Sequence, residues 1–359
     1  MIITYVAGLV ALFFAMNIGA SGAAAAVSVA YGSGAIQTRK RALLLCAIAI
    51  FLGAVIGGGE VAETIGTGII PQSIMTAKVV LIILVAAAIS LFIANMLGIP
   101  LSTSEITVGA VVGVGIAQQA LYINNILVIV SFWFIVPILG FGLAFIFGKV
   151  ITKLTHKYPG LQKKKAQKIL TIFVIIIGFF EAFSAGMNNV GNAVGPLIGA
   201  NLISVTTGTV VGGIFIAAGV MFLGGRVLQT NAKKITKFTL LEGGTISSIG
   251  ATLVMTASIF GLPVPLTQVT STAIMGIGVS KKGKNQVNKK VISKIVKVWL
   301  VSPVFSLVIS YGLMKLFIDS DIYTVVVLVS VCLATIGIIS LIKTIKQENS
   351  AYVDHGEGI

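Results

Sequence analysis

The sequence has few of the groups that carry chemistry in enzymes. Only 10% of its 359 residues are charged, ten are acidic, and the chain has two histidines and two cysteines. It contains no H-E-x-x-H motif and no paired-aspartate metal motif within an apolar run. Neither Cys46 nor Cys332 has a histidine nearby in the sequence, and both lie in apolar runs. We therefore expect no catalytic residues, no metal site and no cofactor, and the chain is not predicted to be an enzyme.

Apolar residues dominate instead. They make up 57% of the chain, the mean hydropathy is +1.07, and apolar runs recur from end to end. Runs of about 20 residues are long enough to cross a bilayer as helices. The sequence predicts an all-α polytopic membrane protein with ten to twelve transmembrane helices and the lipid bilayer as its surroundings. The expected spans are 3–16, 42–59, 79–94, 106–120, 123–147, 169–185, 204–223, 240–260, 268–280, 298–317 and 322–342.

The net charge of +15 does not indicate nucleic-acid binding, because the basic residues are confined to short loops. Alternate loops hold 23 of the 25 lysines and arginines, and only Lys78 and Lys315 fall on the opposite side. Basic loops stay in the cytoplasm. The pattern predicts a multi-pass protein of the cell membrane with the N-terminus outside and the C-terminus in the cytoplasm.

Three sequence blocks recur in the same order. They pair residues 17–26 with 184–193, 58–64 with 224–230, and 100–115 with 263–278, at offsets of 167, 166 and 163 residues. Five spans lie between equivalent points of the two copies. Because this number is odd, the second copy should cross the membrane in the opposite direction to the first. Inverted repeats with broken helices at matching places are typical of secondary transporters. The expected parts are a first repeat (1–148), a basic cytoplasmic linker (149–168), an inverted second repeat (169–320), an extra span (321–343) and a cytoplasmic tail (344–359).

Glycines, prolines and polar residues interrupt each repeat twice, which predicts four broken or re-entrant segments. Irregular backbone in a membrane must be buried in protein or line a wet cavity. Each break carries residues that favour helix N-termini, whose free N–H groups and dipole attract anions. These residues are Ser21, Ser102 to Ser104, Asn188 with Asn189, and Thr267. The alternative interpretation is that small residues at these places only allow close helix packing.

The paired blocks resemble the PiT family of inorganic phosphate transporters, over nearly the whole chain. That family carries a G-[AS]-N-D-V-A-N-A type signature and a later P-V-S-T-T-H type segment in each repeat. The most specific match is "GMNNVGNAVGPL", residues 186–197. The chain departs from the family where the signature has its aspartates, which here are Gly22 and Asn189, and the later asparagine of the first repeat is Ala25.

The loss of both signature carboxylates bears on the substrate. Phosphate keeps a proton near neutral pH and can donate it to a carboxylate, whereas sulfate only accepts hydrogen bonds. A buried aspartate beside sulfate would add repulsion. The chain is therefore similar to the CysP-type sulfate permeases within the family. We predict a secondary transporter that imports sulfate, or thiosulfate and other tetrahedral oxyanions, at a midplane site. The predicted binding residues are Ser21, Thr103, Ser104, Asn188, Asn189 and Thr267, with Asn17 and Asn192 shaping the breaks.

The same loss weakens a sodium site, because hard cations favour carboxylate oxygens. Protons are then the expected coupling ion, with sodium as the alternative. Acids at membrane depth are candidate proton carriers. They are Glu105, which takes the position of the family's histidine, and Glu60, Glu181 and Glu242. Two other functions stay open: a phosphate transporter of the same family, coupled to protons or sodium, and an anion channel. A homo-oligomer is also compatible with the sequence.

Overall fold

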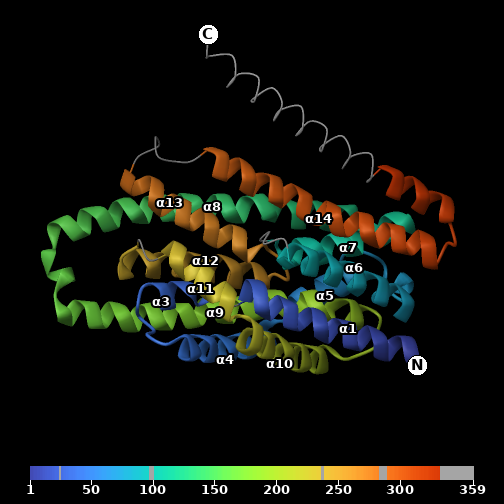
Figure 1. Cartoon of the computed structure of the whole chain (residues 1–359), viewed down its shortest axis with the longest axis horizontal. Coiled ribbons are helices and arrows are strands. Elements are labelled where there is room, and N and C mark those ends of the chain that lie inside the picture. Colours follow the sequence, from blue (N-terminus) through green and yellow to red (C-terminus); the bar gives the residue numbers. More distant parts are fainter. Residues whose placement is uncertain (24–25, 97–100, 236–237, 283–288, 332–359) are drawn as a thin grey trace, which may run out of the picture. The chain divides into compact units, whose positions relative to one another are not determined.

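The computed structural model describes residues 1–23, 26–96, 101–235, 238–282 and 289–331. Cys332, His355, Ala25, Pro100, the end of the predicted last span and the predicted tail lie outside the described residues. Every element that is described is helical, which confirms the all-helical prediction over these residues (Figure 1).

The first half of the chain forms α1 (Ile2–Ile18), η1 (Gly19–Ala23), α3 (Ser28–Gly32), α4 (Arg39–Gly57), α5 (Gly59–Thr67), η2 (Gln72–Ile74), α6 (Ala77–Met96), α7 (Thr103–Ala117) and α8 (Ile123–Lys157). The second half forms η3 (Pro159–Gln162), α9 (Lys164–Gly199), α10 (Val205–Leu223), α11 (Gly225–Ile235), α12 (Leu240–Ile259), α13 (Leu266–Lys282) and α14 (Lys289–Phe317). A further helix covers Ile322–Val331.

Seven of the described helices are long and apolar enough to cross a membrane. They are Ile2–Gly22, Arg39–Gly57, Ala77–Ala94, Ile123–Lys157, Lys164–Gly199, Val205–Leu223 and Leu240–Ile259. With 35 and 36 residues, α8 and α9 are each about 50 Å long at 1.5 Å per residue, more than a hydrocarbon core needs. Their excess length takes in most of the basic segment that we predicted as a linker.

The chain divides into two compact units, Met1–Ser310 and Tyr311–Ile359. In the first unit, α9 packs against α4, α5 and α12, and α8 packs against α13. In the second unit, Lys315 pairs with Asp319 at 2.8 Å. The Thr324 hydroxyl and backbone N–H both donate to the carboxylate of Asp321, which lies before the helix Ile322–Val331.

Three of the four predicted interruptions are present. The first is the π-helical η1 and the non-helical step before α3, the second separates α6 from α7, and the fourth separates α12 from α13. The third prediction is wrong, because α9 runs unbroken through residues 184–197 with Pro196 inside it. Its asparagines find side-chain partners in other helices, and its glycines serve helix packing.

Helices α4 and α9 are in direct backbone contact. A Cβ added to Gly53 would lie 1.9 Å from the carbonyl oxygen of Phe183, and one added to Gly186 would lie 2.1 Å from that of Ile50. No real Cβ fits at such distances. Glycine therefore allows the two helix backbones to touch, as small residues do in membrane helix pairs.

Helices α1 and α10 make the same kind of contact. A Cβ on Gly219 would lie 2.1 Å from the Met16 carbonyl oxygen, and one on Gly19 would lie 2.0 Å from that of Ile216. Each of these four positions is 166 or 167 residues away from its counterpart in the contact between α4 and α9. The same helix contact thus occurs twice, at the offsets of the sequence blocks.

We expect Gly53→Ala to destabilise the protein by about 3 kcal/mol, because the added methyl group must push two backbones apart. Thermal unfolding of the purified protein in detergent measures the effect. Gly142→Ala is the matched control, since a Cβ there meets nothing within 4 Å in helix α8. Equal melting temperatures for the two variants would contradict the tight contact.

Candidate functional site

A buried polar cluster joins the start of α7 to the middle of α9. Thr103 and Ser104 come from the first turn of α7, and Asn188, Asn189 and Asn192 come from about one turn of α9. All five side chains are buried. Residues at i, i+3 and i+4 of a helix share a face, so the three asparagines point the same way. The cluster consists of hydroxyls and amides only.

Asn189 is held by its oxygen. The Thr103 hydroxyl donates to Asn189 Oδ1 at 2.7 Å, and Asn192 Nδ2 donates to the same oxygen at 3.3 Å. Over the described residues, both hydrogen bonds of the Asn189 side chain end on Oδ1. Its amide nitrogen therefore keeps two N–H donors for another acceptor.

Asn188 forms two hydrogen bonds with the extended segment before α13. Its Nδ2 donates to the Val264 carbonyl at 2.8 Å, and its Oδ1 accepts from the Val264 N–H at 3.0 Å. Pro263 and Pro265 on either side have no N–H. The Asn188 amide thus supplies both partners that the buried Val264 peptide groups need, in the manner of a neighbouring strand.

The other predicted donors lie apart from this hydrogen-bonded cluster. The Ser21 hydroxyl donates to the Asn17 carbonyl at 2.9 Å, and Asn17 Nδ2 donates to the Phe13 carbonyl at 2.9 Å, so both bond within their own helix. Ser21 lies inside the π-helical turn, so its predicted place as a helix N-cap is wrong. Thr267 is half-buried and lies just inside α13, which begins at Leu266.

Glu105 and Gln268 face each other between α7 and α13. Gln268 Nε2 donates to Glu105 Oε1 in a short contact, and both side chains are buried. Gln268 Oε1 is also buried, and it has no hydrogen-bond partner among the described residues. The pair borders a cavity of about 270 Å³ whose other walls are mostly apolar, including Trp133, Trp299 and Pro303. Little water can therefore solvate a charge on Glu105.

Glu181 is the second acid in the interior. Its side chain is fully buried on α9, and the Thr270 hydroxyl donates to Oε1 at 3.3 Å. Oε2 has no hydrogen-bond partner over the described residues. Glu181 is thus buried like Glu105 but lies in a separate polar group.

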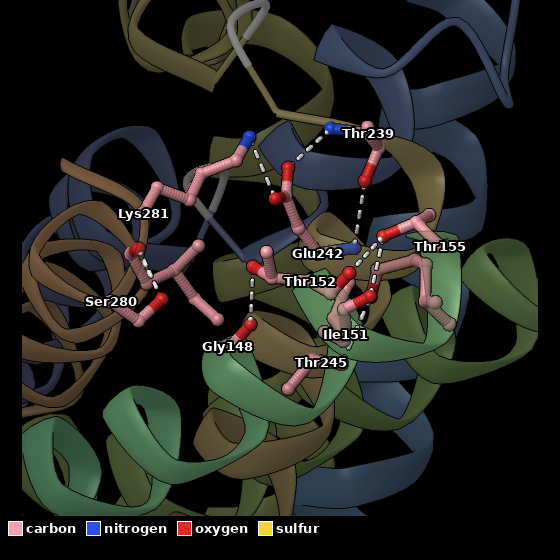
Figure 2. A network of polar contacts seen from close by, with 11 residues as sticks. Gly148, Ile151, Thr152, Thr155, Thr239, Glu242, Thr245, Ser280 and Lys281 are labelled. Carbon is pink, nitrogen blue, oxygen red and sulfur yellow. Dashed lines mark hydrogen bonds and ion pairs between the residues drawn. The ribbon is translucent and has the colours of Figure 1, made fainter. Parts of the chain in front are cut away.

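Glu242 and Glu60 lie in structural positions. Glu242 forms a capping box at the start of α12, where its Oε2 accepts from the Thr239 N–H at 2.8 Å. Lys281 pairs with the other carboxylate oxygen at 2.7 Å (Figure 2). Glu60 is exposed in the first turn of α5, where the helix dipole favours an acid. These environments favour structural roles over the proton-carrying roles that we predicted for both residues.

The family model for the phosphate transporter family matches residues 18–310. This match takes in nearly all of the first compact unit and more than half of the chain. The chain belongs to the phosphate transporter family. As a member of this family it is a multi-pass membrane transporter, not an enzyme.

Individual members of the phosphate transporter family agree with this assignment. The chain is 55% identical to the sulfate permease CysP of Bacillus subtilis, over 98% of both chains. It is 26% identical to the chloroplastic inorganic phosphate transporter 2-1 of Arabidopsis thaliana, over 84% of this chain and 70% of the relative. A solved structure of a sodium-dependent phosphate transporter matches with a TM-score of 0.77 and 27% identity, over 89% of this chain and all of that one.

Four groups of the interior were not predicted from the sequence: the Val264 backbone, Gln268, Thr270 and Ser247. Two of them carried a signal. The repeat offset of 163 residues relates Gln268 to Glu105, and the prolines around Val264 mark an extended segment whose peptide groups need outside partners. Thr270 and Ser247 become visible only when α9, α12 and α13 are packed together.

Proposed function

We propose that this chain imports inorganic sulfate across the cytoplasmic membrane by alternating access, coupled to protons. The observation that carries the proposal is the Asn189 amide, whose oxygen is engaged and whose N–H donors remain available. The PiT signature has an acid at this position. High identity to a protein named as a sulfate permease supports the same substrate.

Donor chemistry separates sulfate from phosphate. The cluster around Asn189 offers amide and hydroxyl donors, and sulfate accepts hydrogen bonds without needing to donate any. Over the described residues, the cluster has one unpaired acceptor, the amide oxygen Asn192 Oδ1, but no carboxylate for the proton of phosphate. The alternative is a phosphate transporter, as the family name and the solved relative suggest. Competition uptake separates the two: excess phosphate should leave labelled sulfate uptake nearly unchanged, and strong suppression by phosphate would favour the alternative.

We propose that the Asn189 amide donates to the anion, with Thr103 and Asn192 holding Asn189 in orientation. The hydroxyls of Thr103 and Ser104 donate to Asn189 Oδ1 and to the Val264 carbonyl, and they are proposed to turn to the anion when it binds. Asn188 is assigned to Val264 instead, because both of its polar atoms are engaged there. Ser21 and Thr267, with Asn17 shaping the first break, are proposed to face the same site in other states of the transport cycle. The helix N-terminus at Thr103 adds backbone donors beside the cluster.

The proposed carrier consists of two inverted repeats, 1–148 and 169–320, with a cytoplasmic linker between them at 149–168. Helix starts support it: α4 begins at Arg39 and α10 at Val205, and α5 begins at Gly59 and α11 at Gly225, 166 residues apart in both pairs. Helices α6 and α12 begin at Ala77 and Leu240, and α7 and α13 at Thr103 and Leu266, 163 residues apart. The doubled glycine contacts follow the same offsets.

Within this arrangement the N-terminus lies outside and the C-terminus in the cytoplasm, with ten to twelve spans once the shorter helices are counted. The segment 321–343 is an additional span and 344–359 a cytoplasmic tail. The basic loops support this orientation.

Glu105 is the proposed coupling residue. When ionised, it accepts from Gln268 Nε2 but leaves Gln268 Oε1 buried and unpaired. When protonated, it can donate to Oε1 while still accepting from Nε2, as in an acid–amide pair. Protonation of Glu105 therefore gives Gln268 Oε1 a hydrogen-bond partner. Leaving this oxygen buried without a partner costs about 1–3 kcal/mol. Because the two residues are equivalent positions of the proposed repeats, their bond links the two halves of the carrier.

We expect Glu105→Gln to weaken proton-driven accumulation of sulfate while retaining sulfate exchange. The new amide pairs with Gln268 as the protonated acid would, so the protein folds but cannot release a proton. Labelled sulfate in proteoliposomes measures both activities. Glu63→Gln, which changes an exposed acid of α5, is the control. Normal proton-driven accumulation in the Glu105 variant would remove Glu105 from the coupling mechanism.

A further inference from the structure

Glu181 lies in a polar group built by three helices. It comes from α9, Thr270 from α13 donates to Oε1 at 3.3 Å, and the Ser247 hydroxyl of α12 faces the same carboxyl. Both Glu181 Oε2 and Ser247 Oγ are buried and have no hydrogen-bond partner by geometry among the described residues. A Cβ on Gly250 would lie 3.2 Å from Oε1, so α12 approaches the carboxyl closely. Over the described residues, the carboxyl thus meets neutral hydroxyl groups but no cation.

No ion pair in the described part of the chain involves Glu181. Among the described residues, the titratable group that interacts with it from another helix is the buried thiol of Cys46 on α4. A carboxylate buried without a cation is costly, and such groups become neutral instead. A proton on Oε2 turns it into a donor that can reach Ser247, while Oε1 still accepts from Thr270. Over the described residues, the groups around Glu181 are neutral hydroxyls and a thiol, so a bound proton removes the cost of a buried, unpaired charge.

This group also lies near the anion cluster along the same helix. Glu181 and Asn188 are seven residues apart on α9, which is about two turns, so they share a face and lie about 10 Å apart along the axis. Glu105 bonds to Gln268 and Glu181 to Thr270, so the two acids do not share a partner. The interior thus holds two separate acids that can each carry a proton.

We propose that Glu181 is a second proton-binding site of the carrier, so that two protons, one on Glu105 and one on Glu181, accompany each sulfate dianion. The inference rests on the proposed function. Two protons balance the two negative charges of sulfate, and the transport cycle moves no net charge. The accumulation of sulfate then depends on the pH difference across the membrane and not on the membrane potential.

Sulfate accumulation at steady state in proteoliposomes tests the proposal, with the pH difference and a potassium diffusion potential set separately. For the wild type we expect about 100-fold accumulation per pH unit and no effect of potential. Glu181→Gln should accumulate about 10-fold per pH unit, and 100 mV negative inside should lower its accumulation about 50-fold, which corresponds to 2.3 kcal/mol per charge. Glu63→Gln should behave as the wild type.

Wild-type accumulation of 10-fold per pH unit, or unchanged stoichiometry in Glu181→Gln, would overturn the second proton site while leaving sulfate transport intact. A wild-type protein that accumulates no sulfate under any gradient would overturn the proposed function itself. If Glu181→Gln does not fold, Ser247→Ala replaces it. The Ser247 hydroxyl stabilises the ionised acid, so its removal should move the pH dependence of uptake toward higher pH by about one unit, and an unmoved profile would count against the site.

Discussion

Replacing Asn189 by aspartate is expected to lower sulfate uptake at least 100-fold, about 3 kcal/mol, while the protein still folds. The aspartate keeps an oxygen for Thr103 and Asn192, so the cluster stays hydrogen-bonded. It replaces the two amide donors with a second oxygen that repels a dianion. Initial rates of labelled sulfate uptake in proteoliposomes measure the loss, and thermal unfolding in detergent verifies the fold.

The competitor profile of this variant is equally informative. An acid at position 189 can accept the proton of phosphate, so phosphate should compete for transport better than it does in the wild type. Asn124→Asp, at an exposed position near the start of α8, controls for an added charge. Sulfate uptake at the wild-type rate in Asn189→Asp would show that the amide does not bind the anion.

Replacing Asn188 by alanine is expected to destabilise the protein by about 1–3 kcal/mol. The change leaves the N–H of Val264 buried without a partner, while the Val264 carbonyl keeps only its longer bond from the Ser104 hydroxyl at 3.3 Å. The segment between Pro263 and Pro265 then loses the bonds that hold it against α9. The midpoint of thermal unfolding measures the effect, with Asn124→Ala as the exposed control.

Asn188→Asp tests whether Asn188 stabilises the Val264 segment or binds the anion. Its carboxylate can still accept from the Val264 N–H but faces the Val264 carbonyl with a second acceptor. We expect it to be unstable, whereas Asn189→Asp is stable and inactive. The two aspartate variants would then lose activity for different reasons, one through loss of stability and the other through loss of anion binding. Equal stability of the two aspartate variants would contradict the assignment of Asn188 to Val264.

Helix positions could be predicted well from the sequence, because apolar runs between charged loops define them. The expected span 240–260 corresponds to α12 at Leu240–Ile259, and 204–223 to α10 at Val205–Leu223. The expected break at 184–197 was wrong for a physical reason. Glycine and asparagine break an isolated helix, but in α9 Gly186 allows contact with α4, and Asn188 bonds to Val264.

The candidate site was predictable only in part. Composition and repeats identified Asn189, Thr103 and Glu105, which the fold brings to the interface of α7, α9 and α13. Their partners could not be deduced, because a hydrogen bond between residues 86 or 163 positions apart depends on how helices pack. For the same reason, the polar group around Glu181 could not be predicted, because its threonine and serine neighbours look like ordinary small residues in the sequence.

The most direct test of sulfate import coupled to protons is accumulation of radiolabelled sulfate in proteoliposomes of the purified protein, with proton and sodium gradients imposed one at a time. The account predicts accumulation when the outside is acidic, none with an inward sodium gradient alone, and little competition by phosphate. Accumulation driven by sodium, or phosphate accumulated in preference to sulfate, would contradict it.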